Sequence, residues 1–377
     1  MLATIISTTG STPASAFSRM LVKEGGIISL GTVGGGCMEG DVLLHAGRLL
    51  RENKAEILRF HLNEDDVEHG LICGGSLDVL IEPLSREKIP LFEELKSIRD
   101  NGDDCVLATH LAADGFIRSK SVIAGDEKTL IERSKAAQEV LAWASASGRG
   151  PAGTEAPMKE AVIDSILRAQ RRNETVLLKL RDGDVILEPV AGAPGLVLFG
   201  GGHVSKYISR GAAMAGFRVT VVDDRDKFAN RERFPEAVQT VAEDFIEAFN
   251  HITVKPSTYV VIVTRGHRHD EEVLERIAGT SARYIGMIGS RKKVLAAFEH
   301  LAEKGIPAER LRRVHAPMGI DIGAATAEEI GISVVAELIA ERRGAKGPFH
   351  HKSDSMDDPV KGRAKRRPAA SAKRGRA

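Results

Sequence analysis

The chain has 377 residues, of which 42% are hydrophobic and 4% aromatic, and its formal net charge is +1. This length and apolar content suffice for two domains, whereas so few aromatic residues argue against a stacking surface for single-stranded nucleic acid. The sequence has neither a long apolar run nor a signal-peptide pattern, and its three cysteines lack disulfide-framework spacing, so we expect a cytoplasmic protein that does not bind membranes.

The first half of the chain mixes strand and helix signals in no regular order. Apolar alternation predicts a first strand over residues 3–8 and a hairpin of strands 20–22 and 27–30. The elements predicted after these are a helix from Cys37, strands 57–62 and 77–81, a helix 91–99, a strand 106–110 with a polar hairpin, helical segments within 126–173 interrupted at 147–157, and strands 176–180 and 185–188. We expect a smaller N-terminal α/β domain over 1–190, closed by a Pro/Gly-rich linker at 189–195.

Three glycines and a cysteine, Gly34, Gly35, Gly36 and Cys37, precede an amphipathic helix. Because the cysteine opens a helix, unpaired backbone N–H groups and the helix dipole favour its thiolate, and the glycines leave room for a ligand. This pattern suits a soft metal or a sulfur-transfer step. The alternative is a tight turn whose cysteine is a small buried hydrophobe.

A second glycine-flanked thiol, Cys73 with Gly74 and Gly75, precedes the strand at 77–81. Two such sites in one domain favour a shared pocket, although their separation is wrong for a zinc knuckle. Cys105 lies at the start of a strand and is interpreted as structural.

From residue 196 the pattern becomes a regular alternation of strands, turns and helices. The predicted strands are 196–199, 217–222, 239–242, 259–264 and 284–288, with a helix 203–215 after the first and helical patterns after the last three. Apolar strands alternating with helices predict a Rossmann-like, doubly wound parallel sheet over 195–345.

A glycine turn, Gly200, Gly201 and Gly202 followed by His203, links the first of these strands to its helix, and Asp223 ends the next strand. This context fits a dinucleotide fingerprint, in which the turn admits a pyrophosphate and Asp223 accepts from a ribose hydroxyl. The pattern favours an anionic nucleotide or a pterin-type ligand over a purely structural turn.

Arg265, His267 and His269 follow the strand at 259–264, where doubly wound folds bind ligands. The histidines could bind a metal or act as acid and base. The alternative is that Asp270 caps the next helix and the histidines are polar loop residues.

Ser290 is a good helix N-cap, yet Arg291 and Lys292 and the lysine after them crowd the first turn, where the helix dipole disfavours cations. This mismatch favours a bound anion, the alternative being a solvated charge cluster. His315 and Asp321 lie in a glycine-punctuated loop that could reach the same cleft.

The last 17 residues, 361–377, hold eight of the 53 basic residues and none of the 52 acidic ones, which leaves −7 for the rest of the chain. Alanine, proline, glycine and basic residues dominate here, so residues 346–377 are predicted to be a disordered basic tail.

Seven segments together resemble the XdhC/CoxI family, the accessory proteins of bacterial xanthine dehydrogenase and related molybdenum hydroxylases. They are GTVGGGCMEGDV (31–42), CGGSLDVLIEP (73–83), LFGGGHV (198–204), VTVVDDR (219–225), TYVVIVTRGHRHD (258–270), YIGMIGSRKKV (284–294) and RVHAPMGIDIGAATAEEI (313–330). Residues 84–195 and the tail carry no such signature.

The resemblance implies a chaperone that binds the molybdenum cofactor, protects it during sulfuration by a cysteine desulfurase, and inserts it into the apo-hydroxylase. It also implies homodimers, and it suggests that Cys37 and Cys73 contact molybdenum or its sulfur. With the residue chemistry above, it makes the candidate cofactor-binding residues Gly34, Gly35, Gly36, Cys37, Glu39, Cys73, Gly74, Gly75, Gly200, Gly201, Gly202, His203, Asp223, Arg265, His267, His269, Ser290, Arg291, Lys292 and His315.

Two departures from the family stand out. The chain begins on its first strand, where the family usually has a helix first, which indicates a truncated or misassigned start. The family motif Gly-Ser-x-Pro-Arg-x-x-Gly is changed after this strand, with Ala14 in place of the arginine and Phe17 in place of the last glycine.

Two other functions remain open on the sequence. An NAD(P)-dependent oxidoreductase would use the glycine turn and Asp223, with His267 or His269 as acid or base. A sulfur relay, in which Cys37 carries a persulfide to the cofactor, is compatible with the chaperone. We favour a maturation factor without turnover, because a plain dehydrogenase has no use for Cys37 and Cys73.

Overall fold

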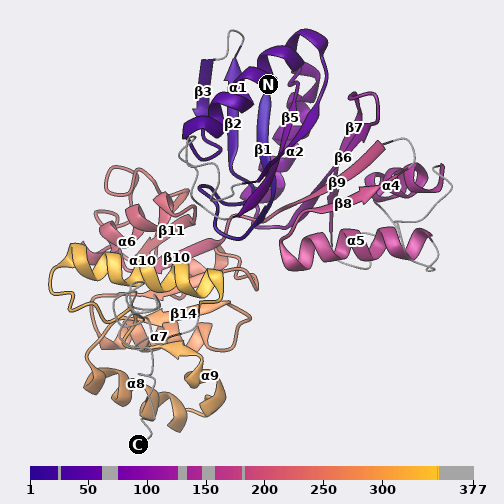
Figure 1. Cartoon of the computed structure of the whole chain (residues 1–377). Coiled ribbons are helices and arrows are strands. Elements are labelled where there is room, and N and C mark those ends of the chain that lie inside the picture. Colours follow the sequence, from indigo (N-terminus) through magenta and orange to yellow (C-terminus); the bar gives the residue numbers. More distant parts are fainter. Residues whose placement is uncertain are drawn as a thin grey trace, which may run out of the picture. The chain divides into compact units, whose positions relative to one another are not determined.

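A computed structural model describes residues 1–23, 27–61, 75–125, 134–146, 158–180, 183–345 and 347 (Figure 1). The chain divides into two compact units, Met1–Ala193 and Pro194–Ala377. In the described part of the chain, no helix has the length and apolar character needed to cross a membrane.

The first unit contains two antiparallel sheets. One has the strand order β3-β2-β1-β5-β4 and the other β7-β6-β9-β8. The elements are β1 (Leu2–Thr9), β2 (Arg19–Lys23), β3 (Ile27–Gly31), α1 (Gly36–Glu52), β4 (Glu56–His61), β5 (Ser76–Glu82), η2 (Arg86–Lys88), α2 (Ile89–Asp100), β6 (Cys105–Ala112), β7 (Ile117–Ala124), α4 (Lys135–Ala146), α5 (Met158–Arg172), β8 (Val176–Lys179) and β9 (Gly183–Val190).

The predicted apolar face of the first helix forms one core. Four residues of α1 are buried against β1, β2 and β5, namely Met38, Val42, Ala46 and Leu49. In the second sheet, one face is covered by α4 and α5. A small apolar cluster that includes Ile6 and Leu80 of the first sheet and Leu111 and Ile186 of the second joins the two sheets.

Ion pairs with buried carboxylates connect the same two sheets. Glu82 of β5, 1% exposed, pairs with Lys120 of β7, and Glu188 of β9, also 1% exposed, accepts from Arg19 of β2 at 3.0 Å. Because losing one partner leaves a buried charge alone, these pairs strongly favour the observed apposition of the sheets.

The second unit is the predicted Rossmann-like domain, with a six-stranded parallel sheet in the order β12-β11-β10-β13-β14-β15. Helices α6 and α10 pack on one face of the sheet, and α7 and α8 pack on the other. The elements are β10 (Gly195–Phe199), α6 (His203–Met214), β11 (Arg218–Asp223), β12 (Gln239–Ala242), η3 (Glu247–Asn250), β13 (Tyr259–Ile262), α7 (His267–Ile277), β14 (Tyr284–Met287), α8 (Arg291–Glu303), α9 (Ala308–Arg312), β15 (Val314–His315) and α10 (Ala327–Arg343).

This sheet differs from the sequence prediction in detail. Between β12 and β13 the structure has the short 3-10 helix η3 and no α-helix, so the prediction of an α-helix there was wrong. A capping box begins α10, with the Thr326 side chain accepting from the Glu329 amide. The strand order reverses between β10 and β13, and at such a switch point ligands bind beyond the carboxyl ends of the strands.

Candidate functional site

The turn before α1 carries three consecutive glycines in left-handed or related backbone conformations, with φ of 125° at Gly34, 77° at Gly35 and 63° at Gly36. Residues other than glycine rarely adopt such backbone angles. A Cβ on Gly34 would lie 2.8 Å from Cε of Met38, whereas nothing lies within 4 Å of a Cβ on Gly35 or Gly36. Cys37 follows in the first helical turn and is exposed. The thiol therefore stands beside two glycines that face open space.

Glu39 holds this turn from inside the helix. Its carboxylate accepts from the Val33 amide at 3.1 Å, the Gly35 amide at 3.0 Å and the Thr32 hydroxyl. The hydrogen bond from Thr32, with those from the loop amides, lowers the pKa of Glu39 despite partial burial. Two turn amides thus donate to the chain's own carboxylate, and Glu39 shapes the turn.

Of the second glycine-flanked cysteine motif, Cys73 and Gly74 lie outside the described residues. Gly75 is described, and a Cβ there would lie 2.4 Å from the carbonyl oxygen of Ser11. Pro13, two residues further on, lies against Gly34. The loop after β1 therefore touches both the Cys37 turn and the residue that follows Cys73 and Gly74.

No metal site is evident among the residues that the structure describes, because no three or more His, Cys, Asp and Glu side chains gather closely enough. Cys105 is 1% exposed, and burial raises the pKa of its thiol to about 11. It remains a protonated thiol in the core, in keeping with the structural interpretation.

In the second unit, two glycines of the turn before α6 are needed because backbone atoms crowd them. A Cβ on Gly200 would lie 2.2 Å from the Val263 carbonyl oxygen, and one on Gly201 would lie 2.0 Å from the Phe228 carbonyl oxygen. Gly202, the N-cap of α6, has nothing within 4 Å of its Cβ position. Only the third glycine faces open space.

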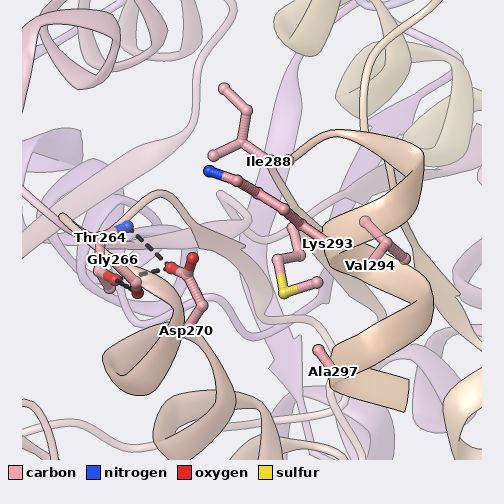
Figure 2. A pocket seen from close by; sticks show the side chains of 9 residues that line it. Thr264, Gly266, Asp270, Ile288, Lys293, Val294 and Ala297 are labelled. Carbon is pink, nitrogen blue, oxygen red and sulfur yellow. Dashed lines mark hydrogen bonds between the residues drawn. The ribbon is translucent and has the colours of Figure 1, made fainter. Parts of the chain in front are cut away.

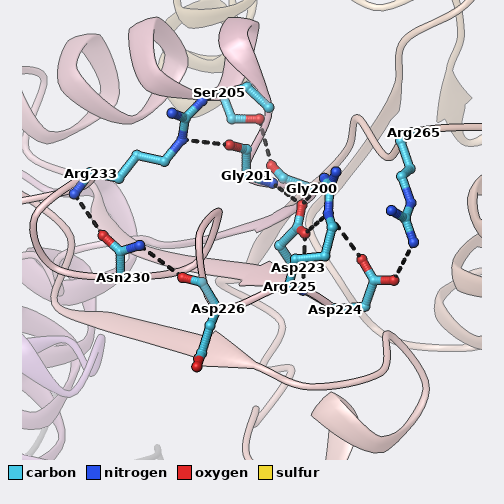
Figure 3. Close-up of polar contacts among 11 residues, drawn as sticks. Gly200, Gly201, Ser205, Asp223, Asp224, Arg225, Asp226, Asn230, Arg233 and Arg265 are labelled. Atoms are coloured by element: carbon cyan, nitrogen blue, oxygen red, sulfur yellow. Dashed lines mark hydrogen bonds and ion pairs between the residues drawn. The ribbon is translucent and has the colours of Figure 1, made fainter.

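Asp223 ends β11, as predicted, but the residue is 1% exposed and its carboxylate is engaged within the chain (Figure 3). It accepts from the Gly201 amide at 2.8 Å, and from Arg225 through its amide at 3.2 Å, Nε at 2.8 Å and Nη2 at 3.1 Å. Burial alone would raise the pKa of Asp223, but the hydrogen bonds from Arg225 and Gly201 outweigh it and lower the pKa.

The remaining candidates near the switch point also have partners. Arg265 donates to Asp224 at 2.6 Å, and His203 packs edge-on against Tyr207. His269 is partly buried, and its Nδ1 lies 3.3 Å from a Glu272 oxygen without a hydrogen bond. The side chain of His267 lies outside the described part of the chain, so its predicted role stays a prediction.

A cavity of about 150 Å³ lies where β13 and β14 end, between the first turns of α7 and α8 (Figure 2). Its lining includes Gly289 and Lys293 but not Ser290, Arg291 or Lys292, which are exposed. Ser290 occupies the N-cap position of α8 without a side-chain capping bond, and the first turn has no acidic residue.

The carboxylate of Asp270 also lines this cavity, and it accepts from the Thr264 amide at 3.2 Å and hydroxyl at 2.6 Å. It braces the loop after β13 from within α7 and is not the N-cap of that helix, which is Gly266. Ligand pockets are typically about 300–1,000 Å³, so this cavity suits one small group, such as a phosphate beside Lys293.

His315 lies in a network that sequence reasoning missed. Glu337 of α10 accepts from His315 Nδ1 at 2.8 Å, from Tyr284 Oη at 3.2 Å and from the Gly319 amide. The hydrogen bond with Glu337 raises the pKa of His315. The loop before α10 is therefore tied to that helix. The sequence signal for this network was Glu337, an acid beside the apolar stripe of Val334 and Leu338 on the last helix.

The structure thus defines an α/β protein of two units. The first unit has an exposed cysteine at a glycine turn, and the second has a Rossmann-type sheet with a glycine turn of its own. Comparison with known proteins identifies the family. A family model described as the XdhC and CoxI family matches residues 1–61, and one described as the XdhC Rossmann domain matches residues 196–338. The chain belongs to the XdhC and CoxI family.

Individual proteins also resemble this chain in sequence or in fold. The chain is 25% identical over 350 residues to a Bacillus subtilis protein named as a probable subunit of xanthine dehydrogenase, covering 91% of this chain and 93% of that protein. It is 37% identical over 155 residues to the uncharacterized protein YqeB of Escherichia coli, which is 41% of this chain but spans only 28% of YqeB. A crystal structure of a xanthine dehydrogenase from Bacillus halodurans shares the fold, with a TM-score of 0.68, 23% identity, and coverage of 92% of this chain and 94% of that chain.

Proposed function

We propose that this protein is a maturation factor that binds the molybdenum cofactor as cargo, protects it during sulfuration, and inserts it into a xanthine dehydrogenase or a related molybdenum hydroxylase. Membership of the XdhC and CoxI family supports a role beside such an enzyme. The name of the Bacillus subtilis relative, a probable xanthine dehydrogenase subunit, points to the same partner. A cysteine desulfurase as sulfur donor and a homodimer as the active form belong to the same proposal.

The observation that carries this proposal is the exposed Cys37 beside Gly35 and Gly36, with free space over both glycines. A thiolate is a soft ligand that suits soft metal centres and sulfur chemistry. Glu39 keeps the turn in shape, so the thiol is presented without reorganisation of the loop. These residues fit the edge of a bulky, sulfur-ligated cofactor, with Cys73 as the second thiol.

An anionic group of the cargo could pair with Lys293 in the cavity between α7 and α8, on the side away from the carboxylate that Asp270 turns to Thr264. The helix dipole of α8 adds to the charge of this lysine, since its first turn carries no acid. This feature supports an anionic ligand for the second unit and does not distinguish a pterin phosphate from other phosphates.

The alternative of an NAD(P)-dependent oxidoreductase loses its main support. That function needs Asp223 to accept from a ribose hydroxyl, and the carboxylate is buried and already accepts from Gly201 and Arg225. Of its candidate acid and base, the described one, His269, lies beside Glu272 and Phe245.

The test is anaerobic equilibrium binding of molybdenum cofactor to the purified protein, with NAD and NADP measured in parallel. We expect cofactor binding in the wild type and at least about tenfold weaker retention of molybdenum in Cys37→Ala, as for loss of a metal ligand. Cys105→Ala is the matched control, because it removes a buried thiol far less able to bind. An undiminished molybdenum content of Cys37→Ala would show that the thiol is not part of the binding site. Nicotinamide binding without cofactor uptake would put the oxidoreductase first.

A further inference from the structure

We propose that Arg225 is a specificity-determining residue that occupies the ribose position of the glycine turn and so prevents Asp223 from recognising the ribose hydroxyls of a nucleotide. In dinucleotide-binding sheets, the acid at the end of the second strand accepts from the ribose hydroxyls. Here the corresponding acid is Asp223, and the guanidinium of Arg225 stands where those hydroxyls would donate (Figure 3).

The capacity of the Asp223 carboxylate is already used. A carboxylate offers about four acceptor positions, and Asp223 accepts four hydrogen bonds, one from Gly201 and three from Arg225. Two of these come from a guanidinium, which makes them charge-assisted and stronger than a bond from a neutral hydroxyl. A ribose diol would therefore have to displace a better donor from a buried acceptor.

Arg225 is held in this position from its other sides as well. Its guanidinium lies over the Phe228 ring at 3.7 Å from the ring centre, and its Nε is 3.5 Å from an oxygen of Asp224. Asp224 is in turn bound by Arg265 at 2.6 Å. Swinging Arg225 away would break the Asp223 fork and a cation–π contact together.

The segment after Arg225 fills the space beside the turn. The Phe228 carbonyl lies against Gly201, and Arg233 donates to the Gly201 carbonyl at 2.9 Å and the Gly202 carbonyl at 3.1 Å. Asn230 braces the segment by accepting from the Arg233 amide at 2.9 Å. Residues 225–233 thus hold the glycine turn and Arg225 in place, while Gly202 stays accessible.

The test compares 5′-AMP with 2′,3′-dideoxy-AMP, which differ only in the ribose hydroxyls, by equilibrium binding to the full chain. In the wild type we expect equal affinities or no binding of either nucleotide. In Arg225→Met, which frees two acceptor positions of Asp223, 5′-AMP should bind at least about fivefold more tightly than its dideoxy analogue, the factor expected for one gained hydrogen bond.

Arg231→Met is the matched control, because Arg231 lies in the same segment but donates to the carbonyls of Ala237 and Val238. It should behave as the wild type. If Arg225→Met does not fold, as judged by thermal melting, Arg225→Lys should show a smaller preference in the same direction, since lysine keeps the charge and one donor to Asp223 but loses the fork. A fivefold hydroxyl preference in the wild type, or none in the folded Arg225 variants, would overturn the proposal. Only nucleotides are used, so failure of the molybdenum cofactor proposal would leave this result unaffected.

Discussion

At the start of α1 and again at the start of α6, a carboxylate of the chain accepts a hydrogen bond from an amide of a glycine-rich turn. In the first unit this acid is Glu39, which lies within the helix that the turn begins. In the second unit it is Asp223, which comes from the neighbouring strand β11. In both turns, a carboxylate of the chain therefore already occupies an amide that could otherwise bind an anionic ligand.

The glycines of the two turns are required for different reasons. Gly35 and Gly36 have positive φ and face open space, so their backbone angles alone demand glycine. Gly201 has crowded surroundings instead, with the Phe228 carbonyl oxygen where a Cβ would stand. The α1 turn is thus shaped from within and accessible, whereas the α6 turn is packed against other segments of its unit.

This difference assigns different roles to similar sequence signals. An accessible turn that ends in an exposed cysteine can receive a bulky ligand without disturbing the core. A turn covered by residues 225–233 contributes mainly to packing and leaves access only at Gly202. Substitutions that add a side chain test the space around the α6 turn and the backbone angle of the α1 turn separately.

The largest effect is expected for Gly201→Ala. The new Cβ would lie 2.0 Å from a backbone oxygen, so the turn or the 225–233 segment must shift. We expect a loss of about 3 kcal/mol in the free energy of unfolding, at the upper end for overpacked sites. Gly202→Ala is the control, because its Cβ meets nothing within 4 Å, and it should cost at most about 1 kcal/mol as an N-cap change. Equal losses in urea unfolding would contradict the contrast.

A smaller effect is expected for Gly35→Ala, where the cost comes from φ of 77° and not from a clash. The loss should be about 2 kcal/mol, and Gly35→Asn should lose about as much, because φ of 77° with ψ of −177° lies in a backbone region that essentially only glycine adopts. Reaction of Cys37 with a thiol reagent should remain as fast as in the wild type, because the turn stays open. A loss as large as that of Gly201→Ala would show that the α1 turn is packed after all.

Much of the fold followed from sequence patterns, because those patterns record local physical requirements. The apolar stripe from Met38 to Leu49 predicts α1, and apolar strands alternating with helices predict the parallel sheet of the second unit. The packing of the two sheets of the first unit against each other could not be predicted from the sequence. It depends on contacts such as Arg19 with Glu188, residues 169 positions apart whose charges look like ordinary surface charges in the sequence.

The candidate site was predictable to the same degree. Glycines and an acid at the expected spacing locate the α6 turn, and Asp223 does end its strand. Whether that acid is free depends on the direction of Arg225, and an arginine two residues beyond a strand is usually solvated. Glu39 shows the same limit, since nothing local indicates that its carboxylate turns back onto Val33 and Gly35.

The internal acid of the α1 turn can be tested by Glu39→Gln. We expect a loss of about 1 kcal/mol at neutral pH, because the amides and the Thr32 hydroxyl would lose a charged acceptor. The folded pKa of Glu39 is lowered, so its contribution is present above the unfolded pKa and is lost as the pH falls through the folded value. The stability difference between wild type and variant should therefore shrink below about pH 4.

Glu52→Gln is the control for that experiment. Glu52 lies in the last turn of the same helix and forms an exposed pair with Arg48 at 3.6 Å, worth at most a few tenths of a kcal/mol. A Glu39→Gln effect no larger than this, or one that persists unchanged in acid, would mean that Glu39 does not hold the turn by its charge.

The smallest effect is expected for Phe17→Gly, at the position where the family motif has glycine. Phe17 has φ of 68°, a left-handed backbone angle to which phenylalanine is ill suited. Relief of about 1–2 kcal/mol of backbone strain is offset by about 0.5–1 kcal/mol of extra chain entropy in the unfolded state, so the net gain should be about 0.5 kcal/mol. Ser15→Gly, in the same loop at an ordinary φ, has no strain to relieve and should lose stability. If both variants lose stability in thermal melts, the phenylalanine ring contributes packing that outweighs the strain of its backbone angle.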